Sequence, residues 1–243
     1  MAADDAVELV GLAKKAGVGH RVADAILDVV GAIPKSSEVG SDTPHAQAAA
    51  LAKTASKSAA TISGGAALVP GPFGMLTLLP DIIGVWRVQA QMVADIAAAY
   101  GKTASLTKEQ MLYCLFKHMF SQGLRDVVVR AGERYLVRRA SLQVLQKLAT
   151  MIGIKVTQRA MGKTIARYAP LVGAAGVAAY AFYDTKKVAA TAIELFRGDV
   201  VLEPDGALDS DAVVKPDPVV NADLNLTHFP LDRRSKSDPP WRS

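Results

Sequence analysis

Apolar residues recur at intervals of three and four along most of this chain, the spacing that one face of an α-helix requires. The clearest predicted helix covers residues 79–100, and Gly101 stands at the usual stop position after it. Thr107 followed by Gln110 is typical of a capping box, which would open a helix that ends near Phe120. Because no convincing alternation of period two appears, the sequence predicts an all-α helical bundle over residues 1–197.

Further helices are expected over ranges with the same spacing. These ranges are 4–15, 20–33, 45–62, 124–150, 153–168 and 171–197. Gly17 and Gly19 are expected to separate the first two helices, and residues 34–44 read as a loop between prolines. The short β-branched run Val127-Val128-Val129 is assigned to a helix, because the pattern around it is helical.

An uncharged run extends from Ser58 to Pro80, and Pro70-Gly71-Pro72 interrupts it. A membrane-spanning helix needs about 20 continuous apolar residues, and proline ends or kinks a helix. The run therefore predicts a Gly/Pro-broken apolar helical hairpin, which either dips into a lipid surface or forms part of a protein core. Its apolar positions are Leu68, Val69, Pro70, Gly71, Pro72, Phe73, Leu76 and Leu78. A second uncharged stretch, Tyr168–Tyr183, allows the same two readings.

The composition changes after residue 197. Residues 198–243 hold six of the twelve prolines together with many Asp, Asn and Ser residues, so this segment is predicted to be a disordered tail. From residue 199 onward nine acidic residues face five basic ones, although the whole chain carries a net charge of +5. The basic character therefore belongs to the helical part. It indicates an anionic partner, such as phospholipid headgroups, nucleic acid or an acidic protein.

Two sets of basic residues recur at a helical spacing. Arg130, Arg134 and Arg138 form the first set, and Lys155, Arg159, Lys163 and Arg167 form the second. Each set is expected to make a cationic ridge along one helix, which is either a solvated face or a binding surface for anionic phospholipids. Nucleic acid is the third alternative, and the lack of interleaved aromatic residues disfavours it.

Candidate catalytic chemistry is sparse. Asp81 follows the uncharged run, where it either caps a helix or acts as an ionisable group near a cavity or membrane. Cys114 and His118 stand one helical turn apart, but two ligands do not make a metal site, and the sequence predicts neither a metal nor a cofactor. The enzymatic alternative is a hydrolase-like protein that uses Asp81 or His118 in an apolar pocket lined by the hairpin.

The single cysteine and the first residues bear on location. One cysteine excludes an intrachain disulfide and any multi-cysteine metal site. The first ten residues lack both the basic and the apolar region of a signal peptide. We therefore expect a reduced protein that faces the cytoplasm.

Several motifs resemble one known family over roughly residues 46–195. They are Gly65-Ala66-Ala67-Leu68-Val69-Pro70-Gly71-Pro72-Phe73-Gly74, then Leu79-Pro80-Asp81, then a helix with Arg87, Gln89 and Gln91 that ends Ala99-Tyr100-Gly101. A later element, Pro170-Leu171-Val172-Gly173-Ala174-Ala175-Gly176 followed by Tyr180 and Phe182, agrees as well. In order and spacing these motifs resemble the EcsC protein family, with Ala179 as a departure where that family would have asparagine.

The resemblance implies an all-helical bacterial protein that associates with membranes and has no catalytic mechanism to transfer. Its implied role is a non-enzymatic, peripheral, lipid-binding scaffold or an accessory factor in membrane transport or remodelling. The expected location is the inner face of the membrane. The expected partners are an anionic membrane surface and a membrane transporter, with self-association left open.

Overall fold

A computed structural model describes residues 2–66, 78–120, 124, 127–131, 134–162 and 170–203, and these are mostly helical, as the sequence predicts. The helices are α1 (Ala2–Gly31), α2 (Pro44–Ala66), α4 (Leu78–Ala99), the short 3-10 helix η1 (Thr103–Ser105), α5 (Lys108–Phe116), α7 (Leu142–Gly162) and α8 (Pro170–Arg197). The strands are β1 (Val128–Ala131), β2 (Arg134–Arg138) and β3 (Asp199–Glu203).

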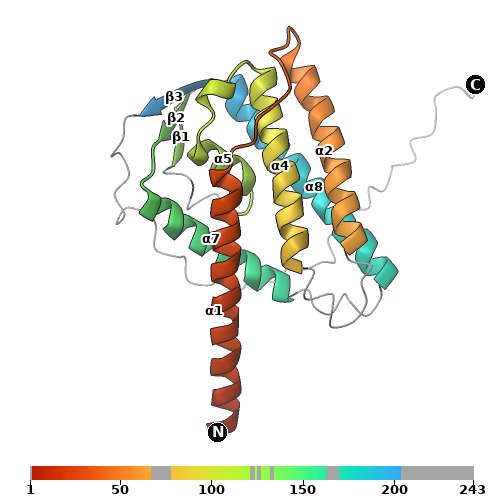
Figure 1. Cartoon of the computed structure of the whole chain (residues 1–243), viewed down its shortest axis with the longest axis vertical. Coiled ribbons are helices and arrows are strands. Elements are labelled where there is room, and N and C mark those ends of the chain that lie inside the picture. The colour runs from red at the N-terminus through yellow and green to blue at the C-terminus, as the bar shows by residue number, and fades with distance from the viewer. Residues whose placement is uncertain are drawn as a thin grey trace, which may run out of the picture.

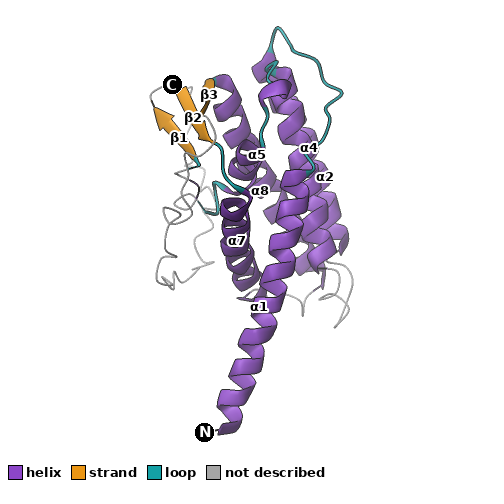
Figure 2. Cartoon of the chain, turned by 60° about the vertical axis from the view of Figure 1, so that its left-hand side comes forward, coloured by secondary structure: helices purple, strands orange, loops and turns teal. Residues whose placement is uncertain are grey.

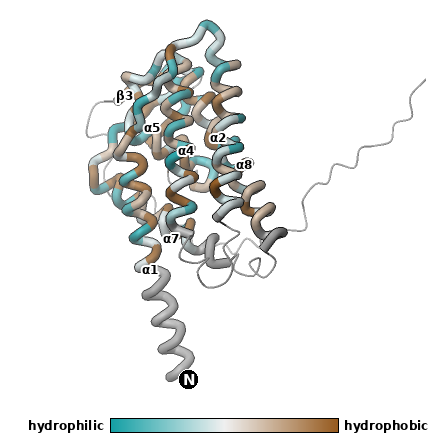
Figure 3. Tube along the Cα trace, turned by 45° about the vertical axis from the view of Figure 1, so that its right-hand side comes forward, coloured by the Kyte–Doolittle hydropathy of each residue, from teal (hydrophilic) through white to brown (hydrophobic). Residues whose placement is uncertain are grey.

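Two groups of helices surround one hydrophobic core. Helices α2, α4 and α8 pack against one another, and α7 crosses α1 on the other side of α4 (Figure 1). Ile26, Met92, Phe116, Leu148 and Phe196 are fully buried, so each of α1, α4, α5, α7 and α8 contributes a large side chain. Figure 3 shows hydrophobic and hydrophilic positions alternating along α4 and its neighbours, as expected for helices with one buried face.

The predicted end of α4 and the predicted start of α5 are confirmed. Gly101 has a positive φ of 68°, a conformation that glycine adopts without strain, and Lys102 N–H donates to the Ala97 carbonyl at 2.8 Å. Thr107 and Gln110 form the capping box, with bonds of 3.1 Å and 3.4 Å between their side chains and backbone amides. These two signals position the turn from which Lys117 and His118 extend.

The predicted helix over residues 124–150 is wrong. Residues 128–131 and 134–138 form two antiparallel strands, with Val129 opposite Leu136, and the helix α7 begins only at Leu142 (Figure 2). The reason is that β-branched residues favour strands, and that buried Tyr135 and Val137 alternate with more exposed neighbours along β2. Arg130, Arg134 and Arg138 therefore lie on strands, and the predicted helical ridge of arginines does not exist.

Two predicted helix breaks are absent. Helix α1 continues through Gly17 and Gly19, and α7 continues through Gly153. Gly19 and Gly153 instead allow α1 and α7 to approach closely, because a Cβ on Gly153 would lie 2.6 Å from the Gly19 carbonyl oxygen. These two glycines allow close packing of the helices, which local helix propensity alone does not predict.

The predicted tail begins too early. Residues 199–203 form β3, which pairs with β2 in parallel, Leu136 opposite Val201, and completes a sheet in the order β1-β2-β3. Val200 and Leu202 pack against the hydrophobic core, so this part of the segment buries apolar surface. The remainder of the predicted tail, residues 204–243, lies outside the described residues.

Candidate functional site

His118 lies in a network of polar side chains that links three parts of the chain. Its Nε2 lies 2.7 Å from Asp184 Oδ1 on α8, and both side chains are only 12% exposed. The other oxygen of Asp184 accepts a hydrogen bond of 2.9 Å from Gln89 Nε2 on α4, which also lies 3.1 Å from Thr185 Oγ1. The sequence suggested His118 but not its partners Asp184 and Gln89, because Asp184 lies 66 positions further along the chain.

This network resembles the half of a catalytic site that orients a base, but it lacks a reacting group among the described residues. His118 Nδ1 is buried, and no described group hydrogen-bonds to it. Cys114, one turn away, is fully buried, and burial raises the pKa of its thiol far above the ordinary value. A thiol held protonated is a poor nucleophile, so the pair of His118 and Asp184 is suited to holding α4, α5 and α8 together.

Asp81 stands in the first turn of α4 and accepts a hydrogen bond of 3.1 Å from Ser63 Oγ on α2. Burial raises the pKa of this carboxyl, and the hydrogen bond from Ser63 lowers it to a smaller degree. The negative charge faces the positive end of the α4 dipole, which is the helix-capping arrangement. Asp81 therefore joins α2 to α4 through Ser63.

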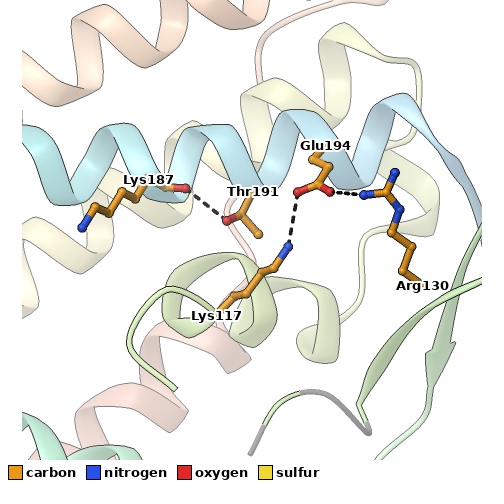
Figure 4. Close-up of polar contacts among 5 residues, drawn as sticks. All are labelled: Lys117, Arg130, Lys187, Thr191 and Glu194. Atoms are coloured by element: carbon orange, nitrogen blue, oxygen red, sulfur yellow. Dashed lines mark hydrogen bonds and ion pairs between the residues drawn. The ribbon is translucent and has the colours of Figure 1, made fainter. Parts of the chain in front are cut away.

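Glu194 on α8 binds two cations (Figure 4). Lys117 Nζ donates to one carboxylate oxygen at 3.2 Å, and Arg130 from β1 donates to the other at 2.7 Å. Burial by itself would raise the pKa of Glu194, but the hydrogen bond from Lys117 and the charges of Lys117 and Arg130 outweigh it, so the pKa is lowered. Arg130 thus pairs with Glu194, its side chain remains 60% exposed, and its lipid binding stays a prediction.

The second set of basic residues is described only in part. Lys155 is exposed on α7, and its Nζ lies 5.1 Å from the ring centroid of Phe120. Arg159 lies on the same helix, which ends at Gly162. The side chain of Arg159 and all of Lys163 and Arg167 lie outside the described part, so their lipid binding stays a prediction.

The predicted apolar hairpin also falls largely outside the description. Leu68, Val69, Pro70, Gly71, Pro72, Phe73 and Leu76 lie outside the described residues, and Leu78 is described only as the first residue of α4. Helices α2 and α4 end and begin at the two sides of this gap. None of the helices that the structure describes is long and apolar enough to cross a membrane.

An exposed apolar surface lies on the two helices that flank these segments. Val177, Tyr180 and Tyr183 recur every three residues on α8 with exposed fractions of 39%, 50% and 57%, and Ile62 on α2 is 36% exposed. We call these four residues the apolar patch. A Cβ on Gly64 would lie 3.2 Å from the Cβ of Ala178, so α2 and α8 pack closely at this level, and a Cβ on Gly84 of α4 would lie 3.4 Å from Cγ2 of Ile62. Sequence reasoning missed the patch because an amphipathic pattern does not reveal which face has no neighbour.

Among the described residues, no group of histidine, cysteine, aspartate and glutamate side chains could hold a metal ion. Comparison of the chain with protein families, curated proteins and solved structures finds no match. The resemblance to the EcsC protein family therefore stays a prediction.

Proposed function

We propose that this protein is a non-enzymatic scaffold or accessory factor that binds peripherally to the inner face of a membrane. The observation that carries the proposal is the apolar patch, which exposes two tyrosines, a valine and an isoleucine on adjacent helices. Tyrosine suits the membrane interface because its ring enters the acyl boundary while its hydroxyl remains hydrated. A membrane transporter is the partner that the family resemblance implies.

The position of the patch supports the proposal. Ile62 lies one turn before the end of α2, and Val177 lies two turns after the start of α8. The uncharged sequence between α2 and α4 and the stretch that precedes α8 therefore join the body at this same end. A surface helix with exposed apolar residues binds a bilayer reversibly when it cannot span it.

The alternative functions have less support. An enzyme using His118 would need a nucleophile or substrate group near Nδ1, and no described group hydrogen-bonds to that atom. An enzyme using Asp81 would need a second reacting group, whereas the bond that Asp81 makes is to Ser63. Nucleic-acid binding relied on two basic helices, and Arg130 of the first set instead lies on a strand and pairs with Glu194.

Vesicle flotation tests the proposal. Wild-type protein should float with phosphatidylserine-containing vesicles, and Tyr180→Ser with Tyr183→Ser should weaken partitioning roughly tenfold or more through the loss of buried aromatic surface. Val39→Ser is the matched control, since Val39 is 77% exposed in the loop between α1 and α2. In cells, a carbonate wash should release the protein from membranes. Wild-type protein that never floats and never sediments with membranes would refute the proposal.

A further inference from the structure

Helices α2 and α8 carry exposed lysines and almost no negative charge. No aspartate or glutamate occurs in α2, and α8 contains only Asp184 and Glu194. Asp184 binds His118 and Gln89 inside the protein, and Glu194 binds Lys117 and Arg130. Every carboxylate on these two helices therefore already has a partner, and none is left to neutralise the lysines on their outer face.

The lysines in question are Lys53 and Lys57 on α2 and Lys186 and Lys187 on α8, and all four are exposed. We call them the lysine belt. Lys53 and Lys57 are one turn apart, while Lys186 and Lys187 are adjacent in sequence. Lys186 Nζ lies 4.8 Å from the ring centroid of Phe182, and Figure 4 shows Lys187 extending away from the Glu194 cluster.

The packing of the two helices brings both halves of the belt to one level. Helix α2 descends in Figure 1 while α8 ascends, so the pair is antiparallel. Gly64 meets Ala178. Lys57 precedes Gly64 by seven residues on α2, and Lys186 follows Ala178 by eight residues on α8. Measured along its own helix, each lysine therefore lies about 11 Å from that contact. The two halves therefore lie at similar distances along the two helices from this contact, farther from it than the residues of the apolar patch.

We propose that the lysine belt binds the phosphate groups of anionic phospholipids while the apolar patch enters the bilayer interface. This inference rests on the proposed function and names the lipid chemistry of that same surface. Lysine stems lie along apolar surface while their ammonium groups reach the phosphates, so a belt beside an apolar patch fits a headgroup layer. The adjacent apolar patch favours a lipid surface over a nucleic acid, whose backbone offers no apolar layer.

The test compares two double variants of equal net charge by flotation with phosphatidylcholine vesicles, with and without phosphatidylserine. Lys57→Gln with Lys186→Gln removes half of the lysine belt. The control, Lys35→Gln with Lys108→Gln, removes two exposed lysines from the loop before α2 and from the first turn of α5. Near an anionic bilayer each lysine raises partitioning about fivefold, so the belt variant should bind phosphatidylserine vesicles about 25-fold more weakly. The control should change little, and added salt should weaken wild type toward the belt variant.

The outcomes distinguish a failure of this inference from a failure of the proposed function on which it rests. Wild type that binds neither vesicle refutes the proposed function and the inference together. Wild type that binds both vesicles, with the belt variant unaffected, keeps the proposed function and overturns the lysine belt. An equal loss in both variants would assign the effect to total charge and also overturn it. If the belt variant lost binding to duplex DNA but not to vesicles, the lysine belt would be assigned to nucleic acid and the inference would be overturned. Circular dichroism should show the same helicity for all three proteins, because the substituted side chains are exposed.

Discussion

Asp184 is a residue on which two other parts of the chain depend. It accepts hydrogen bonds from His118 and from Gln89, and Gln89 is fully buried. Asp184→Ala should therefore lower the free energy of unfolding by about 2–4 kcal/mol, because both groups lose their acceptor inside the protein. Urea denaturation measures the change. Asp24→Ala, at an exposed position on α1, should cost no more than about 0.5 kcal/mol.

The same substitution bears on catalysis. If His118 served only to hold the helices, Asp184→Ala and His118→Ala would weaken folding without changing any cellular phenotype beyond the loss of protein. A well-folded His118→Ala protein that loses its phenotype completely would instead favour the enzymatic alternative.

Gly153 is a second residue whose substitution should affect stability, because its position has no room for a larger side chain. A methyl group there would lie 2.6 Å from the Gly19 carbonyl oxygen and 3.1 Å from the Ala23 amide nitrogen, and neither backbone atom can move without shifting α1. Gly153→Ala should cost about 1–3 kcal/mol, although alanine is the better helix former. Gly17→Ala is the control, since a Cβ at that position would have nothing within 4 Å, and it should be neutral or slightly stabilising. Equal melting temperatures for the two variants would show that α1 and α7 are not tightly packed.

Asp81 gives a pH-dependent prediction. Burial raises the pKa of its carboxyl, so folding favours the protonated form. The stability linked to this proton is fully present below the unfolded pKa of about 3.9 and is lost as the pH rises through the folded pKa. Asp81→Asn should therefore be more stable than wild type at neutral pH, and its advantage should shrink as the pH falls through the folded pKa towards about 4, with no further change below it. Thermal melts across this range measure it. A lower melting temperature for Asp81→Asn at neutral pH would show that the charged carboxylate stabilises the fold.

At the scale of elements, the sequence predicted those whose signals are local. The stop at Gly101 and the capping box of Thr107 and Gln110 are short motifs with one geometry, and both occur as expected. The strands were missed because their stability depends on distant pairing. Leu136 of β2 pairs with Val201 of β3, a partner beyond two intervening helices that periodicity alone cannot identify.

The candidate site was predictable to a smaller extent. His118 was identified by its chemistry, but its partners Asp184 and Gln89 come from other helices. Arg130 looked like a ligand for an outside anion because spacing shows neither strands nor internal partners such as Glu194. The apolar patch and the lysine belt follow from which helix faces remain uncovered, and that depends on the packing of the whole molecule.

Strand β3 is the last element of the fold that the structure describes. Val200 and Leu202 pack against the core, so a chain that stops at residue 198 loses this contact and leaves β2 without its parallel neighbour. It should be less stable than the full chain by about 2–4 kcal/mol, the value of two partly buried aliphatic side chains. A chain that stops at residue 203 keeps the strand and should melt at the wild-type temperature. If both truncated chains melted alike, β3 would make no contribution to the fold.

At the scale of the whole molecule, the polar network and the apolar patch occupy different places. The side chains of Asp184 and Glu194 join α8 to α4, α5 and β1 within the body, while Tyr180 and Tyr183 remain exposed on the same helix. On α8, Asp184 lies one turn after Tyr180, so the exposed residues and the residues that join the core follow one another along this helix. A bilayer that binds the apolar patch should leave the loop between α1 and α2 in water, because that loop precedes the opposite end of α2 (Figure 1).

The single cysteine makes this orientation testable by thiol labelling. Cys114 is fully buried and burial raises the pKa of its thiol, so it should react very slowly with a maleimide probe while the protein is folded. Thr61→Cys, exposed beside Ile62, and Ser37→Cys, exposed in the loop before α2, then each carry one reactive thiol. With a polarity-sensitive probe, the label at position 61 should shift to shorter wavelength when phosphatidylserine vesicles are added, because it enters the bilayer interface. The label at position 37 should not change, and wild-type protein treated in the same way should remain unlabelled. A shift at position 37 equal to that at position 61 would show that the protein does not bind lipid through α2 and α8.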